Sequence, residues 1–232
     1  MTHLFRSILM GTLLISCCAS LIAQAPADLQ AENARIQSLW MQKKFAEAAT
    51  ILEARAAFER EISVVAARGW DGTIRTFPIS QNHHVNGILS TSLAPAEVTP
   101  DLALKAHDIA RRVLEGLGYV GVLAVEMFVL PGGELLLNEI APRVHNSGHW
   151  TQDGCLCDQF EQHIRAVAGW PLGDTSARCT VEMTNLLGPD ILKWPELVTE
   201  PNARLYVYGK DFSLKDGPRP GRKMGHINRI RS

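Results

Sequence analysis

The distribution of glycine and proline divides this chain into two parts of different character. The sequence of 232 residues contains 18 glycines, yet none lies between Gly11 and Gly69. Of its 12 prolines, only Pro26 precedes residue 70. Glycine and proline mark turns and loops. The first quarter therefore predicts helix with few tight turns, whereas the rest predicts short strands and helices joined by many turns.

The charge balance excludes several classes of protein. The chain has 23 lysines and arginines against 24 aspartates and glutamates, a net charge of −1, and 46% of its residues are hydrophobic. These values exclude a basic nucleic-acid arm, an acidic tail and a disordered polymer. We therefore expect no nucleic-acid partner. A chain of this length can bury a core as one domain or as two small ones.

Residues 1–25 resemble a secretory signal. A short apolar stretch over residues 8–23 follows one positive charge, although Pro26 directly after the expected cleavage site weakens the pattern. Leu14-Ile15-Ser16-Cys17 resembles a lipoprotein signal, with Cys17 as the lipidated residue. An accidental apolar helix is the alternative. The stretch is shorter than the roughly 20 residues that a membrane span needs, so we expect membrane contact only if this segment is a real signal or anchor.

Residues 26–52 predict a helical hairpin that is unrelated in character to the rest of the chain. Alanine, glutamate, glutamine, lysine and leucine dominate this segment, and apolar residues recur at helical spacing. Residues 41–44 are a candidate turn. The segment is similar to the start of a tetratricopeptide repeat, but one such unit cannot bury its own apolar face.

The cysteines predict neither a disulfide framework nor a zinc site. Outside the apolar segment only Cys155, Cys157 and Cys179 remain, which is an odd number. Cys155 and Cys157 together with His145 and His149 offer zinc ligands. However, a Cys-x-Cys spacing is not the usual Cys-x-x-Cys knuckle, so we do not expect zinc.

The first elements of the main body are two strands and a helix. Residues 61–67 and 73–79 predict strands, with Asp71-Gly72 as their hairpin turn. Thr99 and Pro100 predict the N-cap and first position of a helix that ends at Gly116 and Gly118. Its predicted buried stripe consists of apolar residues at helical spacing: Leu102, Ala106, Ile109, Val113 and Leu117.

A second hairpin carries two opposed glutamates. Residues 120–130 and 134–140 predict strands, and a two-residue turn at Gly132-Gly133 places Glu126 directly opposite Glu139. Their Cβ atoms are then roughly 5 Å apart, and like charges at that separation destabilise the pair unless something neutralises them. Two converging carboxylates favour Mg²⁺ with nucleotide phosphates. The alternatives are that one carboxyl is protonated, or that the turn has three residues and the glutamates splay apart.

The segment after this hairpin is dense in hydrogen-bond donors. His145 and His149 have the spacing of a helical zinc pair, but Pro142 and Asn146-Ser147-Gly148 predict a loop. Such a loop suits anionic ligands, and a purely structural loop is the alternative. The candidate catalytic residues of this loop are Arg143, His145, Asn146, Ser147 and His149.

The C-terminal part predicts one helix, two strands and a basic loop. The helix covers residues 159–167, with Phe160, Ile164 and Val167 facing inward, and the strands cover residues 179–186 and 204–208. Three cations on a loop constrained by proline and glycine suit a phosphate group, with a solvated basic turn as the alternative. These cations are Arg219, Arg222 and Lys223.

Several of these segments, in this order, resemble one enzyme family. The most specific match is the long run Asn138-Glu139-Ile140-Ala141-Pro142-Arg143-Val144-His145-Asn146-Ser147-Gly148-His149-Trp150-Thr151. The other matching segments are Glu61-Ile62-Ser63, Asn82-His83-His84, Gly87-Ile88-Leu89, Tyr119-Val120-Gly121-Val122, Val125-Glu126-Met127-Phe128, Gln159-Phe160-Glu161-Gln162-His163 and Gly221-Arg222-Lys223-Met224-Gly225-His226. Over about residues 53–232 the chain is therefore similar to the N5-carboxyaminoimidazole ribonucleotide synthases, ATP-grasp enzymes of purine biosynthesis.

The resemblance implies a fold and a reaction. The fold is α+β: a partial ATP-grasp domain of antiparallel sheet with helices over residues 53–177, then a small β-rich unit over residues 178–232. In the reaction, ATP phosphorylates bicarbonate to carboxyphosphate. The amine of 5-aminoimidazole ribonucleotide then accepts the carboxyl group, which yields N5-carboxyaminoimidazole ribonucleotide, ADP and phosphate.

The resemblance also implies a role for each candidate residue. Glu126 and Glu139 hold Mg²⁺ on the ATP phosphates, and the five loop residues named above line the site of bicarbonate, carboxyphosphate and imidazole. Arg219, Arg222 and Lys223 bind the ribonucleotide 5′-phosphate. The remaining candidates are Glu53, Glu61 and Asn138 for the nucleotide and His84 for the substrate.

The chain also departs from the family pattern. A Rossmann-like substrate domain and a lobe with phosphate-contacting lysines are expected before residue 53, where the signal-like segment and hairpin stand instead, and family members continue past Ser232. We therefore expect a fragment with little or no synthase activity alone. The family implies a cytoplasmic homodimer. The alternatives are a non-catalytic nucleotide- or phosphate-binding remnant and an envelope-anchored interaction protein.

Overall fold

The computed structural model describes residues 58–210 and 220–231. The chain divides into two compact units, Met1–Ala57 and Phe58–Ser232, and the described residues all belong to the second. The predicted apolar segment 1–25, the predicted helical hairpin 26–52, Glu53 and Arg219 lie outside the described residues.

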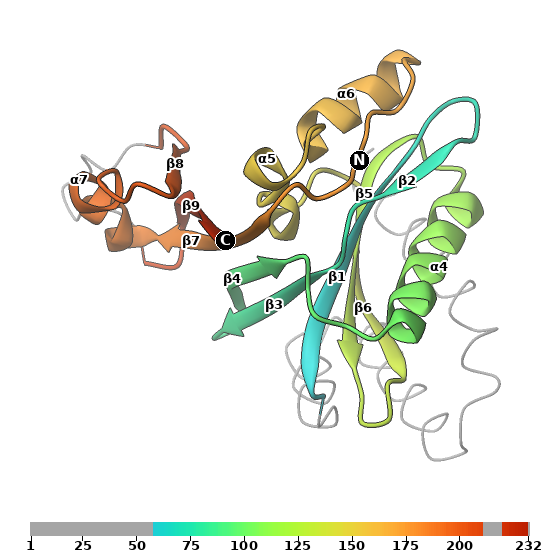
Figure 1. Cartoon of the computed structure of the whole chain (residues 1–232), viewed down its shortest axis with the longest axis horizontal. Helices are drawn as coiled ribbons and strands as arrows, with labels where there is room; N and C mark the ends of the chain where they lie inside the picture. The colour runs from blue at the N-terminus through green and yellow to red at the C-terminus, as the bar shows by residue number, and fades with distance from the viewer. Residues whose placement is uncertain (1–57, 211–219, 232) are drawn as a thin grey trace, which may run out of the picture. The chain divides into compact units, whose positions relative to one another are not determined.

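A nine-stranded antiparallel sheet forms the framework of the second unit, which confirms the α+β class (Figure 1). Its strands are ordered β6-β5-β1-β3-β4-β7-β9-β8, and β2 pairs with β1 off this path. The strands are β1 (Arg60–Arg68), β2 (Ile74–Thr76), β3 (Ser80–Val85), β4 (Ile88–Ala94), β5 (Gly121–Val129), β6 (Leu135–Ala141), β7 (Thr180–Leu187), β8 (Ala203–Val207) and β9 (Lys223–Arg231).

Helices cover both faces of the β1–β5 part of this sheet, with α4 on one side and α6 on the other (Figure 1). The helical elements are α4 (Pro100–Leu117), α5 (Thr151–Gly154), α6 (Gln159–Ala168) and α7 (Trp194–Leu197), with 3₁₀ turns η1 (Asn146–Gly148) and η2 (Gly188–Lys193). No helix within residues 58–210 and 220–231 is both long and apolar enough to cross a membrane.

The start and end of α4 match the sequence prediction. The Thr99 hydroxyl accepts a hydrogen bond from the Leu102 amide at 3.3 Å, and Gly118 ends the helix in the left-handed conformation at φ 57°. The fully buried face is rotated slightly from the predicted stripe. Leu102 and Ala106 are buried as expected, but Ala110 and Leu114 complete the buried row, while the other predicted residues pack partly buried at its edge.

Strands β1 and β5 alternate between two hydrophobic layers. Ile62, Leu123 and Val125 face α4, whereas Val65 and Val122 face the opposite layer. The opposite layer also contains Trp150, which is fully buried, and residues of β7. Both strands are therefore covered on both faces, and the second layer fixes the segment that follows β6.

The β5–β6 hairpin has the predicted carboxylate pairing but not the predicted turn. Val129 pairs with Leu135, so the loop between them is longer than the two-residue turn at Gly132-Gly133. The register then shifts at Asn138, where β6 carries one extra residue, and Glu126 pairs with Glu139. A β-bulge of this kind compensates for the longer loop. The expectation of a two-residue turn was wrong, whereas the opposition of the two glutamates is confirmed.

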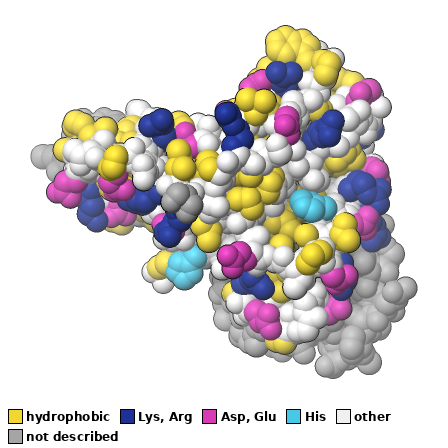
Figure 2. Space-filling view, viewed as in Figure 1, with side chains coloured by type: hydrophobic (Ala, Val, Ile, Leu, Met, Phe, Trp, Pro, Cys, Tyr) yellow, Lys and Arg dark blue, Asp and Glu magenta, His cyan; other side chains and the backbone are white. Residues whose placement is uncertain are grey.

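The predicted inward face of α6 was also wrong. Phe160, Ile164 and Val167 are 38%, 54% and 43% exposed, whereas Gln159, Gln162 and Ala166 are buried. The glutamines face inward because their amides bond to loops, Gln159 to His145 and Gln162 to Gly173. Figure 2 shows hydrophobic side chains exposed over this region at the top of the view.

The C-terminal strands continue the same sheet. β7 pairs with β4 on one side and with β9 on the other, so hydrogen bonding runs without a break into the last segment. Strands β7 and β8 fall where they were predicted, whereas β3, β4 and β9 were not predicted. A third, smaller core cluster lies here, formed by Leu186, Ile191, Met224 and Ile227.

Candidate active site

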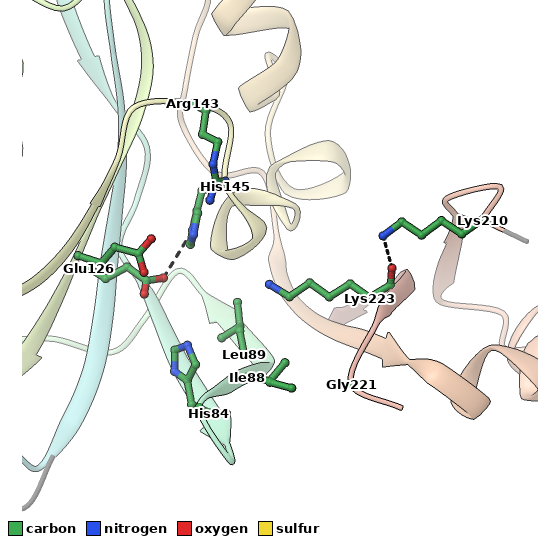
Figure 3. Close-up of a pocket in the computed structure, with 11 residues that line it drawn as sticks. His84, Ile88, Leu89, Glu126, Arg143, His145, Lys210, Gly221 and Lys223 are labelled. Atoms are coloured by element: carbon green, nitrogen blue, oxygen red, sulfur yellow. Dashed lines mark hydrogen bonds and ion pairs between the residues drawn. The ribbon is translucent and has the colours of Figure 1, made fainter. Parts of the chain in front are cut away.

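One cavity of about 450 Å³ brings together residues from distant parts of the sequence (Figure 3). It lies between the β3–β4 hairpin, the carboxylate pair, the segment after β6 and the start of β9. Its lining residues are His84, Gly87, Ile88, Leu89, Glu126, Glu139, Arg143, His145, Lys210, Gly221 and Lys223.

The carboxylate pair forms the acidic wall of this cavity. Glu126 is only 6% exposed, whereas Glu139, its partner across the strands, is exposed. Burial, together with the nearby Glu139 carboxylate, raises the pKa of Glu126 to about 7, although His84 and Lys223 oppose that shift. The buried Oε1 atom of Glu126 accepts no hydrogen bond from the described residues. A buried carboxylate with an unsatisfied oxygen is suited to receive a cation.

Two carboxylates could hold a divalent cation here. Among the described residues, no three His, Cys, Asp or Glu side chains group together as a metal site of their own. This arrangement fits Mg²⁺, which is usually held by one or two carboxylates plus substrate phosphates rather than by a cage of protein ligands. Cys155 and Cys157 are free and buried.

Glu61 and His84 form a second ionisable pair beside the first. They extend from the neighbouring strands β1 and β3, and the His84 Nδ1 atom contacts a Glu61 carboxylate oxygen. This hydrogen bond raises the pKa of His84, with the Glu61 charge acting in the same direction. His84 lines the cavity, whereas Glu61 does not.

His145 is held in a fixed, neutral state next to Glu126. It caps η1, with the Ser147 amide donating to its Nδ1 atom at 3.4 Å and the Ser147 hydroxyl 2.9 Å from the same atom. Its Nδ1 atom is 3.5 Å from Oε1 of Glu126. Burial lowers the pKa of His145 to about 3, helped by nearby cations. The ring is therefore uncharged at neutral pH and offers an Nε2 proton to a ligand.

Of the other predicted loop residues, Arg143 lines the cavity, whereas Asn146, Ser147 and His149 do not. Asn146 and Ser147 are buried in η1, and His149 follows them. Both polar atoms of the Asn146 side chain lack a hydrogen-bond partner among the described residues. Burial lowers the pKa of His149 to about 4. The prediction that His145 and His149 do not share an α-helix is confirmed, because the 3₁₀ turn η1 lies between them.

Cations face the carboxylates from the other walls. The Lys223 amine points toward the side of the cavity where Glu126 and His145 lie, and Arg143 lies beside His145 (Figure 3). Burial lowers the pKa of Lys223. Lys210 donates to the Lys223 carbonyl and lies 5.3 Å from the Tyr208 ring centroid. An acidic wall facing a basic wall suits a metal-bound phosphate chain.

Some candidate residues lie outside this cavity, and one lining cation was missed. Arg222 is exposed and does not line the cavity, and Asn138 is the exposed extra residue of the β-bulge next to Glu139. Lys210 was not predicted because a single lysine forms no pattern. Its only signal is the preceding Gly209, whose φ of 62° marks a turn that redirects the chain.

Two family models match this chain. The ATP-grasp domain matches residues 28–160, and the phosphoribosylaminoimidazole carboxylase C-terminal domain matches residues 182–232. The first match covers more than half of the chain and includes both glutamates. The second includes Lys210 and Lys223.

Relatives and solved structures agree with these matches. The N5-carboxyaminoimidazole ribonucleotide synthase of Brucella melitensis is 50% identical over 185 residues, which cover 80% of this chain and 50% of the relative. The synthetase structure from Thermus thermophilus has a TM-score of 0.70 at 44% identity, covering 81% of this chain and 53% of its own.

Two further structures, of the synthase from Aspergillus clavatus, are 32% identical. One is a complex with ATP, with a TM-score of 0.71, and covers 76% of this chain and 47% of its own. The other is a complex with ADP and 5-aminoimidazole ribonucleotide, with a TM-score of 0.70, and covers 76% and 48%. The chain spans about half the length of the curated relatives it matches. With the fold, the cavity and both family models in agreement, the chain belongs to the N5-carboxyaminoimidazole ribonucleotide synthase family of ATP-grasp enzymes.

Proposed function

We propose that this cavity binds Mg·ATP and 5-aminoimidazole ribonucleotide for the ATP- and bicarbonate-dependent synthesis of N5-carboxyaminoimidazole ribonucleotide. The observation that carries the proposal is that Glu126 and Glu139 line one cavity together with Lys223, Lys210 and Arg143, with the Lys223 amine pointing toward Glu126 (Figure 3). ATP in one related structure, and ADP with 5-aminoimidazole ribonucleotide in another, support the choice of ligands.

The carboxylates serve the nucleotide end of the proposed site. Glu126 and Glu139 are the two residues that would hold Mg²⁺, which would supply positive charge against the nucleotide phosphates. Because burial keeps the pKa of Glu126 near 7, cation binding requires this carboxyl to lose a proton that it partly retains at neutral pH.

The cations and the neutral histidine serve the anionic reactants. Lys223, Lys210 and Arg143 would bind phosphate and carboxylate oxygens, and the Nε2 proton of His145 would donate to an oxygen of bicarbonate or carboxyphosphate. His145 is suited to donating and not to accepting a proton from the amine, because its buried ring resists charge.

The remaining roles rest on the family resemblance. Glu61 and Asn138 are proposed to contact the nucleotide, His84 the substrate, and Asn146, Ser147 and His149 to shape the loop around the reacting groups. Arg222 is proposed to act on the ribonucleotide phosphate from outside the cavity wall. Glu53 is proposed to contact the nucleotide and Arg219 the ribonucleotide phosphate, and both lie outside the described residues. The homodimer implied by the family is likewise a proposal.

Calorimetric titration with Mg·ATP tests this function directly. The purified chain should release or absorb heat that depends on magnesium, and Glu126→Gln should remove the magnesium dependence because one ligand oxygen loses its charge. Glu134→Gln, which changes an exposed acid in the same hairpin, is the matched control and should bind as the wild type does. Binding in the wild type that is unaffected by Glu126→Gln would contradict the metal assignment.

A turnover assay separates the enzyme from a binding remnant. Release of phosphate from ATP should require both bicarbonate and 5-aminoimidazole ribonucleotide if the reaction is as proposed. Binding of both Mg·ATP and 5-aminoimidazole ribonucleotide without release would indicate a site that holds its substrates but does not turn them over. Mg·ATP binding alone would favour the non-catalytic nucleotide-binding module, and no binding at all would reject both functions. The expectation of little or no turnover by this chain alone stays a prediction, and clear turnover by residues 26–232 would contradict it.

A further inference from the structure

Four rings are stacked where the C-terminal strands meet the His145 loop. In order they are Phe160, His149, His226 and Tyr206, with centroid separations of 5.6, 4.5 and 4.5 Å and interplanar angles of 13°, 8° and 11°. They extend from α6, from the residue after η1, from β9 and from β8. The stack therefore joins the last strands of the sheet to the loop that carries His145.

The β-sheet holds His226 rigidly within this stack. His226 is 1% exposed and pairs with Tyr206 of β8 and Asn185 of β7, because β9 is the middle strand of the three. The Tyr208 hydroxyl lies 2.7 Å from the His226 Nδ1 atom, and the Nε2 atom has no partner among the described residues. Retaining a buried imidazole with an unpaired nitrogen costs stability, so an apolar ring would be the simpler filler.

Strand β9 also holds the backbone of His149. Asn228 lies two residues beyond His226 on the same face of the strand, and its Nδ2 atom donates to the His149 carbonyl at 3.0 Å. The same amide donates to Asp153 at 2.8 Å, and Asp153 also accepts from the Tyr206 hydroxyl at 3.0 Å. The ring and the carbonyl of His149 are therefore both fixed by one strand.

Gln159 transmits this position to His145. Its Nε2 atom donates to the His145 carbonyl at 2.7 Å and lies 3.1 Å from Nδ1 of His149, while its Oε1 atom accepts from the His145 amide at 2.8 Å. Because the His145 amide needs an acceptor and its carbonyl needs a donor, these two bonds fix which end of the Gln159 amide is oxygen and which is nitrogen. The Nδ1 atom of His149 must therefore be an acceptor, with the ring proton on Nε2.

We propose that His226 is a positioning residue, which fixes the His145 imidazole beside Glu126 through the stacked His149 ring and the Gln159 amide. It does not line the cavity and would touch no reactant. Its importance for chemistry rests on the proposed function, since that function places reactants against His145. The competing explanation is simple packing, in which any side chain of similar volume would serve equally well.

Histidine NMR on the full chain distinguishes these explanations. With ¹⁵N-labelled histidine, the wild type should show His149 with its proton on Nε2. His226→Leu, which keeps apolar volume without a ring, should change the ring signals of both His149 and His145. His226→Phe, which restores a stacking ring, should return the His145 signals to their wild-type positions. His83→Ala, at an exposed histidine of β3, is the matched control and should leave them unchanged.

Three results would overturn the proposal: unchanged His145 signals in His226→Leu, equal changes in the Leu and Phe variants, or a wild-type His149 protonated on Nδ1. The Leu and Phe variants both preserve buried volume, so a comparison between them does not depend on an alanine variant that fails to fold. Calorimetric titration of the same wild-type sample with Mg·ATP tests the proposed function separately. If no heat is measured but His226→Leu still changes the His145 signals, the proposed function is rejected and the positioning role of His226 is not.

Discussion

Replacement of Glu126 by glutamine should change how the stability of this protein depends on pH. Burial raises the pKa of Glu126 from its ordinary 4.5 to about 7 in the folded chain. Below pH 4.5 the carboxyl is protonated in both the folded and unfolded states and makes no difference. As pH rises from 4.5 to 7, the unfolded chain releases the proton while the folded chain keeps it, so the free energy of unfolding falls.

The size of this effect follows from the difference between the two pKa values. At about 1.4 kcal/mol per unit, the shift corresponds to a loss of about 3 kcal/mol by pH 8, most of which develops between pH 5 and pH 8. The side chain is only 8% exposed, so solvent screening removes little of it. Glutamine cannot ionise, and Glu126→Gln should therefore gain stability relative to the wild type by about this amount as pH rises.

Urea unfolding of both proteins at pH 5 and pH 8 measures this difference without added nucleotide or metal. Burial lowers the pKa values of His145, His149 and His226, so their ionisation destabilises the folded chain as pH falls below 6.5. Because both proteins contain these histidines, their contribution largely cancels when the variant is compared with the wild type at each pH. An equal stability difference at pH 5 and pH 8 would refute the account of Glu126 as a buried carboxyl that resists ionisation.

Two further predictions use pairs of matched variants. Gly225→Ala places a Cβ atom 2.4 Å from the Tyr206 carbonyl oxygen and should destabilise the protein by about 1–3 kcal/mol, whereas Gly116→Ala in α4 meets nothing within 4 Å and should stabilise it by about 0.5–1 kcal/mol. Thermal unfolding checks both, and an equal effect of the two changes would contradict the packing described for β8 and β9. Lys223→Ala should weaken binding of 5-aminoimidazole ribonucleotide about tenfold through loss of a charge-assisted hydrogen bond, and Arg222→Ala, outside the cavity, should weaken it less. Titration calorimetry decides this, and equal losses would show that the basic segment acts through general charge only.

The sequence predicted local elements well where one physical rule dominates. Thr99, Pro100 and Gly118 set the ends of α4 because capping depends on only a few neighbouring residues. The opposition of Glu126 and Glu139 was also predicted, but for an incomplete reason. The loop is longer than expected and the bulge at Asn138 compensates, and alternation of apolar residues alone could not reveal two irregularities that cancel.

Features that depend on distant partners could not be predicted from the sequence. The predicted inward face of α6 was wrong because Gln159 and Gln162 form hydrogen bonds with backbone atoms of distant loops. The spacing of apolar residues along a helix carries no information about such partners. Strand β9 was not predicted because Gly225 and His226 interrupt its apolar pattern. In the sheet, both residues pair with β7 on one side and with β8 on the other. The contribution of Lys210 to the cavity depends on the turn at Gly209 and on the pairing of β8 with β9.

The compensated hairpin has a consequence for how this part of the gene can vary in length. Two one-residue irregularities, the longer loop and the bulge at Asn138, together keep Glu126 and Glu139 on the same side of the sheet. If the bulge straightened while every residue was kept, Asn138 would lie opposite Glu126 and Glu139 would turn toward the α4 layer, because side chains alternate at every residue. Loss of one residue from the loop, or of the extra residue itself, leaves Glu139 opposite Glu126. Viable length variants of this hairpin should therefore change in the loop or at position 138.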